Sequence, residues 1–126
     1  MGIRIVSAAA LASALTFAAQ AEVGMLAGDA LREAVSGKTV MLETPVGALP
    51  INYRTDGTMS GHSRQLASYT GSERDSGTWW VSRDRLCQRW DKWLDGKSYC
   101  FTLRRDGRTV HWTRNDGTTG VATIAR

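Results

Sequence analysis

The 126-residue chain has few of the side chains on which catalytic and metal sites usually depend. It contains two cysteines and two histidines. Cys87 and Cys100 do not form a CxxC pair and have no histidine at ligand spacing, which argues against a zinc site. The sequence also lacks a phosphate-binding loop, a dinucleotide fingerprint and a calcium-binding loop. We therefore expect neither a metal nor a cofactor.

A catalytic constellation is missing as well. His62 adjoins Ser63 in a predicted loop, and His111 falls on the predicted outer face of a strand. No G-x-S-x-G elbow is present, and residues adjacent in sequence seldom point at one another. Most carboxylates stand beside glycine or arginine, as turn residues and solvated charges do. The sequence predicts that this protein is not an enzyme, and a hydrolase that uses His62 remains as an alternative.

Long hydrophobic runs are confined to the beginning of the chain. Residues 1–21 combine Arg4, an apolar run over residues 5–19 and the small-x-small sequence that ends at Ala21. This pattern predicts a secretory signal peptide that is cleaved near Ala21. No later stretch approaches the ~20 apolar residues of a membrane span. We expect residues 22–126 to form a single β-rich domain, periplasmic or secreted, without a transmembrane span.

The positive charge of the chain is mild and dispersed. The formal net charge is +4 at pH 7. No dense cluster of lysine and arginine is present of the kind that binds nucleic acid. For an exported protein, we therefore expect no nucleic-acid partner, and an envelope lipid, glycan or protein is a more suitable one.

The most informative stretch is residues 77–103, which holds four of the five tryptophans and both cysteines. Runs at 78–83, 86–90 and 98–104, separated by turn residues, predict an antiparallel meander. Alternation of side chains places Cys87 and Cys100 on the same face of neighbouring strands and Leu86, Gln88 and Trp90 on the opposite face. That arrangement suits a disulfide, which we predict to stabilise the domain by roughly 3 kcal/mol.

The remaining chain predicts one helix and several further strands. Apolar residues at helical spacing predict a helix over 27–36, with Gly37 after its end. Alternating residues predict two strands on either side of the break at 45–47, and Asp-Gly pairs at 56, 95, 106 and 116 predict turns. The interval 59–76 is least regular, and residues 71–77 predict an exposed loop.

These elements define a fold class. About seven or eight short antiparallel strands and one short N-terminal helix indicate a mainly β protein. We expect a small up-and-down barrel or a strongly curved sheet, lipocalin-like in outline, with the helix as a cap. The alternative is a two-layer α+β sheet.

Aromatic residues provide the main functional signal. Trp79 and Trp80 are adjacent, so on a strand one must face the core and the other must face outward. An exposed indole beside arginine can stack on a sugar ring, an acyl group or a partner protein. The alternative is that arginine stems only cover aromatic surface. The candidate binding surface comprises Trp80, Arg89, Trp90, Trp93 and Arg104.

A longer pattern is formed by Gly77, Thr78, Trp79, Val81, Leu86, Cys87, Trp90, Cys100, Phe101, Asp106 and Gly107. This pattern resembles that of a family of small exported proteobacterial proteins of unknown function. The resemblance spans roughly the mature chain and includes the entry formed by Val35, Gly37 and Thr39. It implies a periplasmic or secreted β domain and assigns no catalytic residue.

Our hypothesis from the sequence is a periplasmic binding or interaction module. Its ligand would be a small apolar molecule or an envelope component, held at the mouth of the barrel or on the tryptophan-arginine surface. The alternative is an inhibitor or structural envelope protein that acts through a protein interface.

Overall fold

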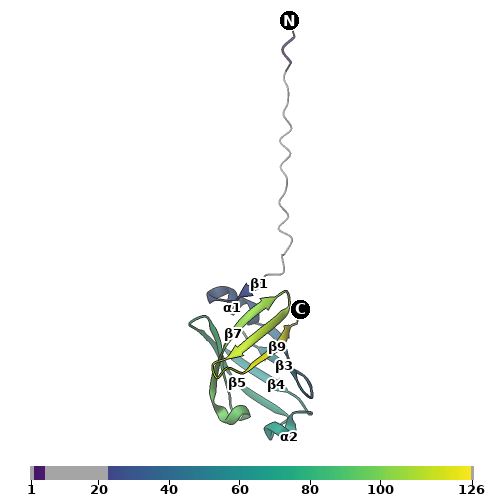
Figure 1. Ribbon diagram of the computed structural model, residues 1–126, viewed down its shortest axis with the longest axis vertical. Coiled ribbons are helices and arrows are strands. Elements are labelled where there is room, and N and C mark those ends of the chain that lie inside the picture. The colour runs from purple at the N-terminus through teal and green to yellow at the C-terminus, as the bar shows by residue number, and fades with distance from the viewer. Residues whose placement is uncertain (1, 5–22, 126) are drawn as a thin grey trace.

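The computed structural model describes residues 2–4 and 23–125 (Figure 1). Apart from residues 2–4, the predicted signal peptide lies outside the described residues. The elements of the described part are β1 (Val23–Met25), α1 (Gly28–Val35), β2 (Lys38–Thr44), β3 (Gly47–Tyr53), β4 (Thr58–His62), α2 (Ala67–Thr70), β5 (Arg74–Ser82), β6 (Arg85–Trp90), the 3-10 turn η1 (Trp93–Gly96), β7 (Ser98–Asp106), β8 (Thr109–Arg114) and β9 (Thr119–Ile124).

Strands β2 to β9 form a closed barrel. Each strand pairs antiparallel with the next one along the chain, and β9 pairs back with β2, which places Val40 opposite Ile124. Within the described residues, this closes an eight-stranded up-and-down barrel. The short β1 pairs with the end of β7, beyond the part of β7 that pairs with β6. The predicted small barrel is confirmed, and closure gives both β2 and β9 a partner on each side.

Helix α1 covers one end of the barrel, and α2 lies at the other end (Figure 1). The apolar stripe of α1 explains its position, because Leu31, Ala34 and Val35 are buried against the strands. The carboxylate of Asp84, in the β5–β6 turn, accepts a 2.8 Å hydrogen bond from the backbone N–H of Gly28. The start of α1 is thereby fixed to the barrel, and the predicted N-terminal helix is confirmed.

Two hairpins use the same turn chemistry. In the β3–β4 turn, Asp56 accepts a hydrogen bond from the backbone N–H of Thr58 at 2.9 Å. In the β8–β9 turn, Asp116 accepts one from the backbone N–H of Thr118 at 3.0 Å. The glycine after each aspartate has a φ of 87° or 89°, a region that glycine enters without steric cost. Both turns carry the sequence Asp-Gly-Thr, at residues 56–58 and 116–118, and they repeat one turn geometry.

The β5–β6 turn lies one residue earlier than predicted. Arg83 and Asp84 both have positive φ, of 52° and 58°, as a two-residue type I′ hairpin loop requires. This pairs Ser82 directly with Arg85. The predicted turn at Asp84-Arg85 was offset because several residues here are polar and suit either position.

The predicted exposed loop over residues 71–77 is wrong in its second half. Strand β5 begins at Arg74, and the side chain of Asp75 is buried. The polar composition misled the prediction, because the carboxylate of Asp75 points inward and is satisfied there by backbone N–H groups. A polar residue can occupy an inward position of a strand when its hydrogen bonds are complete.

Candidate functional site

The interior of the barrel is not completely filled. It contains a cavity of about 240 Å³. Val35 of α1 contributes to the wall at the covered end of the barrel. The aliphatic part of the wall comprises Val40, Leu42, Leu49, Ile51, Leu86, Leu103, Val110, Ala122 and Ile124. Strands β2, β3, β6, β7, β8 and β9 contribute through the alternation of their side chains, so the wall is apolar on most sides.

The cavity opens toward the end that carries α2 and η1. Lining residues at the α1 end, such as Val35 and Ile124, are 1% and 4% exposed. Several lining residues at the other end are partly or well exposed, among them Thr44, Thr70 and Leu94, the last at 43%. The contrast in exposure identifies the mouth of the cavity.

A hydrogen-bonded polar pair interrupts the apolar wall. The hydroxyl of Tyr53 donates a 2.9 Å hydrogen bond to Oε1 of Gln88. Both side chains are buried and both line the cavity. Burial raises the pKa of the Tyr53 hydroxyl well above its usual value, so this group is neutral and acts as a donor. The pair brings hydrogen-bonding capacity to an interior that is otherwise mainly apolar.

Trp90, at the end of β6, and Trp93, at the start of η1, form part of the cavity wall. The rings of Trp90 and Trp93 have centroids 4.7 Å apart and are both about 3% exposed. Asp75 fixes this segment, because its carboxylate accepts 2.8 Å hydrogen bonds from the backbone N–H groups of Lys92 and Trp93. A Cβ atom on Gly61 would lie 2.6 Å from the Trp93 ring, so glycine leaves the space that the indole occupies.

A third tryptophan and an arginine lie toward the mouth on β8. Trp112 packs edge-to-face against Phe101. Arg114 binds the carboxylate of Asp116 through Nη2 at 2.7 Å, and its guanidinium lies 4.4 Å from the centre of the Tyr99 ring. This ion pair raises the pKa of Arg114 and lowers that of Asp116. The positive charge at the mouth is therefore already matched by a carboxylate.

The predicted tryptophan-arginine surface is divided between the two sides of the barrel wall. Trp90 and Trp93 are in the interior and do not belong to an outer surface, because their positions follow the inward alternation of β6 and the turn into η1. Trp80, 37% exposed, Arg89 and Arg104 share the outer face of β5, β6 and β7. The prediction that one of Trp79 and Trp80 faces outward is confirmed.

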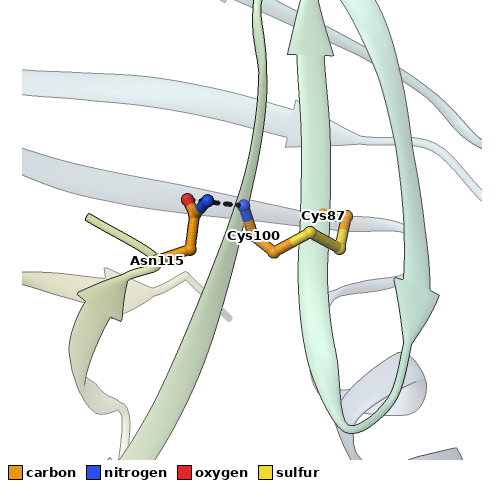
Figure 2. The surroundings of a disulfide bond; sticks show 3 residues. All are labelled: Cys87, Cys100 and Asn115. Atoms are coloured by element: carbon orange, nitrogen blue, oxygen red, sulfur yellow. Dashed lines mark hydrogen bonds between the residues drawn. A yellow bond between two sulfur atoms is a disulfide. The ribbon is translucent and has the colours of Figure 1, made fainter. Parts of the chain in front are cut away.

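The predicted disulfide is present between directly opposed positions of β6 and β7. Cys87 and Cys100 are bonded, with Cα atoms 4.0 Å apart (Figure 2). Oδ1 of Asn115 accepts a long hydrogen bond from the backbone N–H of Cys100, and the N–H of Asn115 donates to the Cys100 carbonyl. The disulfide lies on the outer face, opposite the side of β6 that lines the cavity, so it stabilises the wall and does not contact a ligand inside.

His62, the residue on which the alternative hydrolase prediction rests, lies at the surface beside Glu73. Nε2 of His62 lies 3.7 Å from a carboxylate oxygen of Glu73, and both side chains are about half exposed. Ser63 is buried and makes a long hydrogen bond to Gln65. The described residues contain no group of three or more acidic, cysteine or histidine side chains placed to share a metal ion. Neither helix in the described ranges has the length and apolar character needed to cross a membrane.

The polar pair of Tyr53 and Gln88 was not predicted as a site from the sequence. Leu86, Gln88 and Trp90 were correctly assigned to one face of β6, and glutamine on an apolar, inward face was the available signal. Tyr53 carried a weaker signal, because tyrosine is common in cores and its partner is distant in sequence. Comparisons with protein-family models, with curated proteins and with solved structures found no match to this chain.

Proposed function

We propose that this protein is an exported binding protein that holds a small apolar molecule inside its barrel. The observation that supports this proposal is the cavity of about 240 Å³ with a mainly apolar wall and a mouth at one end. Apolar concave sites with a few fixed polar groups are typical of ligand-binding proteins. A purely structural barrel of this size would fill its interior with side chains.

The size of the cavity limits the ligand. An engineered apolar cavity of about 150 Å³ in another protein holds benzene. By that comparison, a cavity of about 240 Å³ suits a ligand of about ten non-hydrogen atoms. This excludes a whole phospholipid from the interior, although one acyl end of a longer molecule would fit.

Two features support an exported location. Residues 1–21 have the pattern of a signal peptide, which would direct the chain to export, and disulfides persist in oxidising compartments. The Cys87–Cys100 disulfide is consistent with that route. We infer a periplasmic or secreted location, where small apolar molecules pass between the environment and the cell envelope.

A native mass spectrum of protein purified from its own periplasm is the first test. We expect a species heavier than the polypeptide by the mass of a small molecule that is released on denaturation. Naphthalene, a probe of suitable size, then tests the site directly. Trp90, Trp93 and Trp112 line the cavity, so binding should change the intrinsic fluorescence.

A variant that fills the cavity makes this test specific. Ala122 faces the cavity and its neighbour Val121 does not, although both are on β9. Ala122→Phe should weaken naphthalene binding by at least about tenfold, and Val121→Phe should leave it unchanged. Circular dichroism checks that both variants are folded. If naphthalene does not bind, or if both variants bind it as the unaltered chain does, the cavity is not a ligand site and the proposal fails.

A second candidate function is supported by the outer face. Trp80 is exposed beside the disulfide, and its neighbour strand carries the outward-facing Arg85 and Arg89. Such a surface suits a protein or glycan partner. A partner that co-purifies with the unaltered chain, and is lost on Trp80→Ala while naphthalene binding persists, would favour this alternative.

A further inference from the structure

We infer that the ligand carries a neutral hydrogen-bond acceptor, such as a ketone, ester, ether or alcohol oxygen, and that this atom binds the side-chain amide of Gln88. The inference rests on the proposed function and specifies the chemistry of the molecule in the cavity. It is carried by the polar pair of Tyr53 and Gln88, which faces an apolar interior.

The Tyr53–Gln88 pair has more hydrogen-bond donors than it uses. The amide of Gln88 has two N–H groups and the hydroxyl of Tyr53 has one O–H group. Within the described residues, the pair makes one side-chain hydrogen bond, from the Tyr53 hydroxyl to Oε1 of Gln88. Neither N–H group of Gln88 therefore has an acceptor in the described part of the chain. Exchanging the oxygen and nitrogen of the amide would leave the same number of unused donors.

The unused donors of Gln88 lie at the cavity. Gln88 is 7% exposed, and it lines the cavity between Leu86 and Trp90 on the inward face of β6. Its amide nitrogen is not among the enclosed, unpaired polar atoms of the described residues, so the nitrogen contacts the free space of the cavity. A buried donor without a partner is unfavourable by about 1–3 kcal/mol unless a ligand or water supplies the acceptor.

The charges that line the cavity limit which ligand atoms Gln88 can bind. Of the described residues that line the cavity, Arg114 alone is charged, and it lies at the mouth, where it binds Asp116. Among the described residues, no cationic side chain lines the cavity next to the Gln88 amide, and the hydroxyl of Tyr53 is neutral because burial raises its pKa. A carboxylate held at Gln88 would therefore lack a counter-ion in a desolvated site, which is strongly unfavourable. A neutral oxygen carries no such penalty.

The side chains around the polar pair determine how the ligand is oriented in the cavity. The side chains around the polar pair are aliphatic or aromatic, among them Leu86, Leu103 and Trp90. Once the oxygen is bound to Gln88, the hydrocarbon part of the ligand can occupy the remaining apolar space. The geometry points to an apolar molecule with its oxygen inside the barrel and its hydrocarbon part extending toward the mouth.

Two probes with one ring skeleton test the inference. α-Tetralone carries a ketone, and tetralin is the corresponding hydrocarbon. Equilibrium dialysis with gas-chromatographic detection gives both affinities, which are corrected for the octanol–water partition of each probe. We expect α-tetralone to bind about tenfold more tightly than tetralin after this correction. Gln88→Leu should remove that preference and leave the affinity for tetralin unchanged or higher.

Matched variants and a charged probe complete the experiment. Gln65→Leu makes the same substitution at an exposed position and should retain the preference for the ketone. Gln88→Met replaces Gln88→Leu if the latter is not folded by circular dichroism. Equal corrected affinities for the two probes, a preference that survives loss of Gln88, or tighter binding of decanoate than of α-tetralone would each overturn this inference. If tetralin binds in those cases, the proposed function stands. If no probe binds, the proposed function fails as well.

Discussion

Gly120 lies directly opposite Trp112 in the β8–β9 pair, and the indole of Trp112 covers the position that a Cβ atom of Gly120 would occupy. That Cβ would overlap Cζ2 and Cε2 of the indole. Nε1 of Trp112 is buried without a hydrogen-bond partner among the described residues, so this side chain is held by packing. The glycine therefore sets the position of one wall of the cavity.

Gly120→Ala should destabilise the protein, because the indole must move away from its position against β9. We expect a loss of about 1–3 kcal/mol in the free energy of unfolding, as for other overpacked sites. Urea unfolding followed by circular dichroism measures the change. Thr119→Ala, at the exposed neighbouring position, is the control and should have little effect. A Gly120→Ala variant as stable as the control would show that Trp112 is free to rearrange.

Reduction of the Cys87–Cys100 disulfide should destabilise the barrel without abolishing its fold. The bond joins residues 13 apart, and the chain-entropy relation gives a contribution of about 3 kcal/mol. Thermal unfolding with and without a reductant measures it. The chain has no other cysteine, so the double variant Cys87→Ala, Cys100→Ala should match the reduced protein and should not respond to reductant. An unchanged melting temperature after verified reduction would contradict this expectation.

Asp75→Ala should loosen the segment that carries Trp93. The substitution leaves the backbone N–H groups of Lys92 and Trp93 without their acceptor. We expect a destabilisation of about 2–3 kcal/mol and faster hydrogen exchange at these two amides. Asp75→Asn retains one acceptor oxygen and should have a smaller effect. The expectation is refuted if hydrogen exchange at both amides is the same in all three proteins.

Acid should weaken the protein partly through Asp116. The Arg114 guanidinium and the Thr118 N–H hold the pKa of this carboxylate far below its usual value, whereas in the unfolded chain it is about 3.9. A lowered folded-state pKa means that the contribution is present above about pH 4 and is lost as the pH falls below that value. Because the group is exposed, we expect a small effect that salt reduces.

The melting temperature of the Asp116→Asn variant at several pH values measures this contribution. Its melting temperature should be below that of the unaltered chain at neutral pH, and the difference should narrow between about pH 4 and pH 2. Glu43→Gln changes the same charge at a position where no ion pair forms with the described residues, and should not show this narrowing. A constant difference at all pH values would mean that Asp116 acts through its turn geometry and not through its charge.

Local patterns determined much of the architecture. Alternation assigned Leu86, Gln88 and Trp90 to one face of β6 and Cys87 to the other, because side chains of an extended chain alternate with a period of two. The Asp-Gly turns and the helix were predictable for the same reason, since they depend on the φ and ψ preferences of a few neighbouring residues. The disulfide followed once both cysteines were on one face of adjacent strands.

Closure of the barrel and the cavity inside it were decided only in the tertiary structure. No local signal specifies that Val40 pairs with Ile124, because this contact joins the first and last strands of the barrel. The burial of Asp75 depends on the N–H groups of Lys92 and Trp93, and the meeting of Tyr53 with Gln88 joins β3 to β6. Free volume is a property of the whole interior, because it remains where the side chains of all strands fail to fill the enclosed space. The sequence determined which residues face inward, and the assembled barrel decided what they surround.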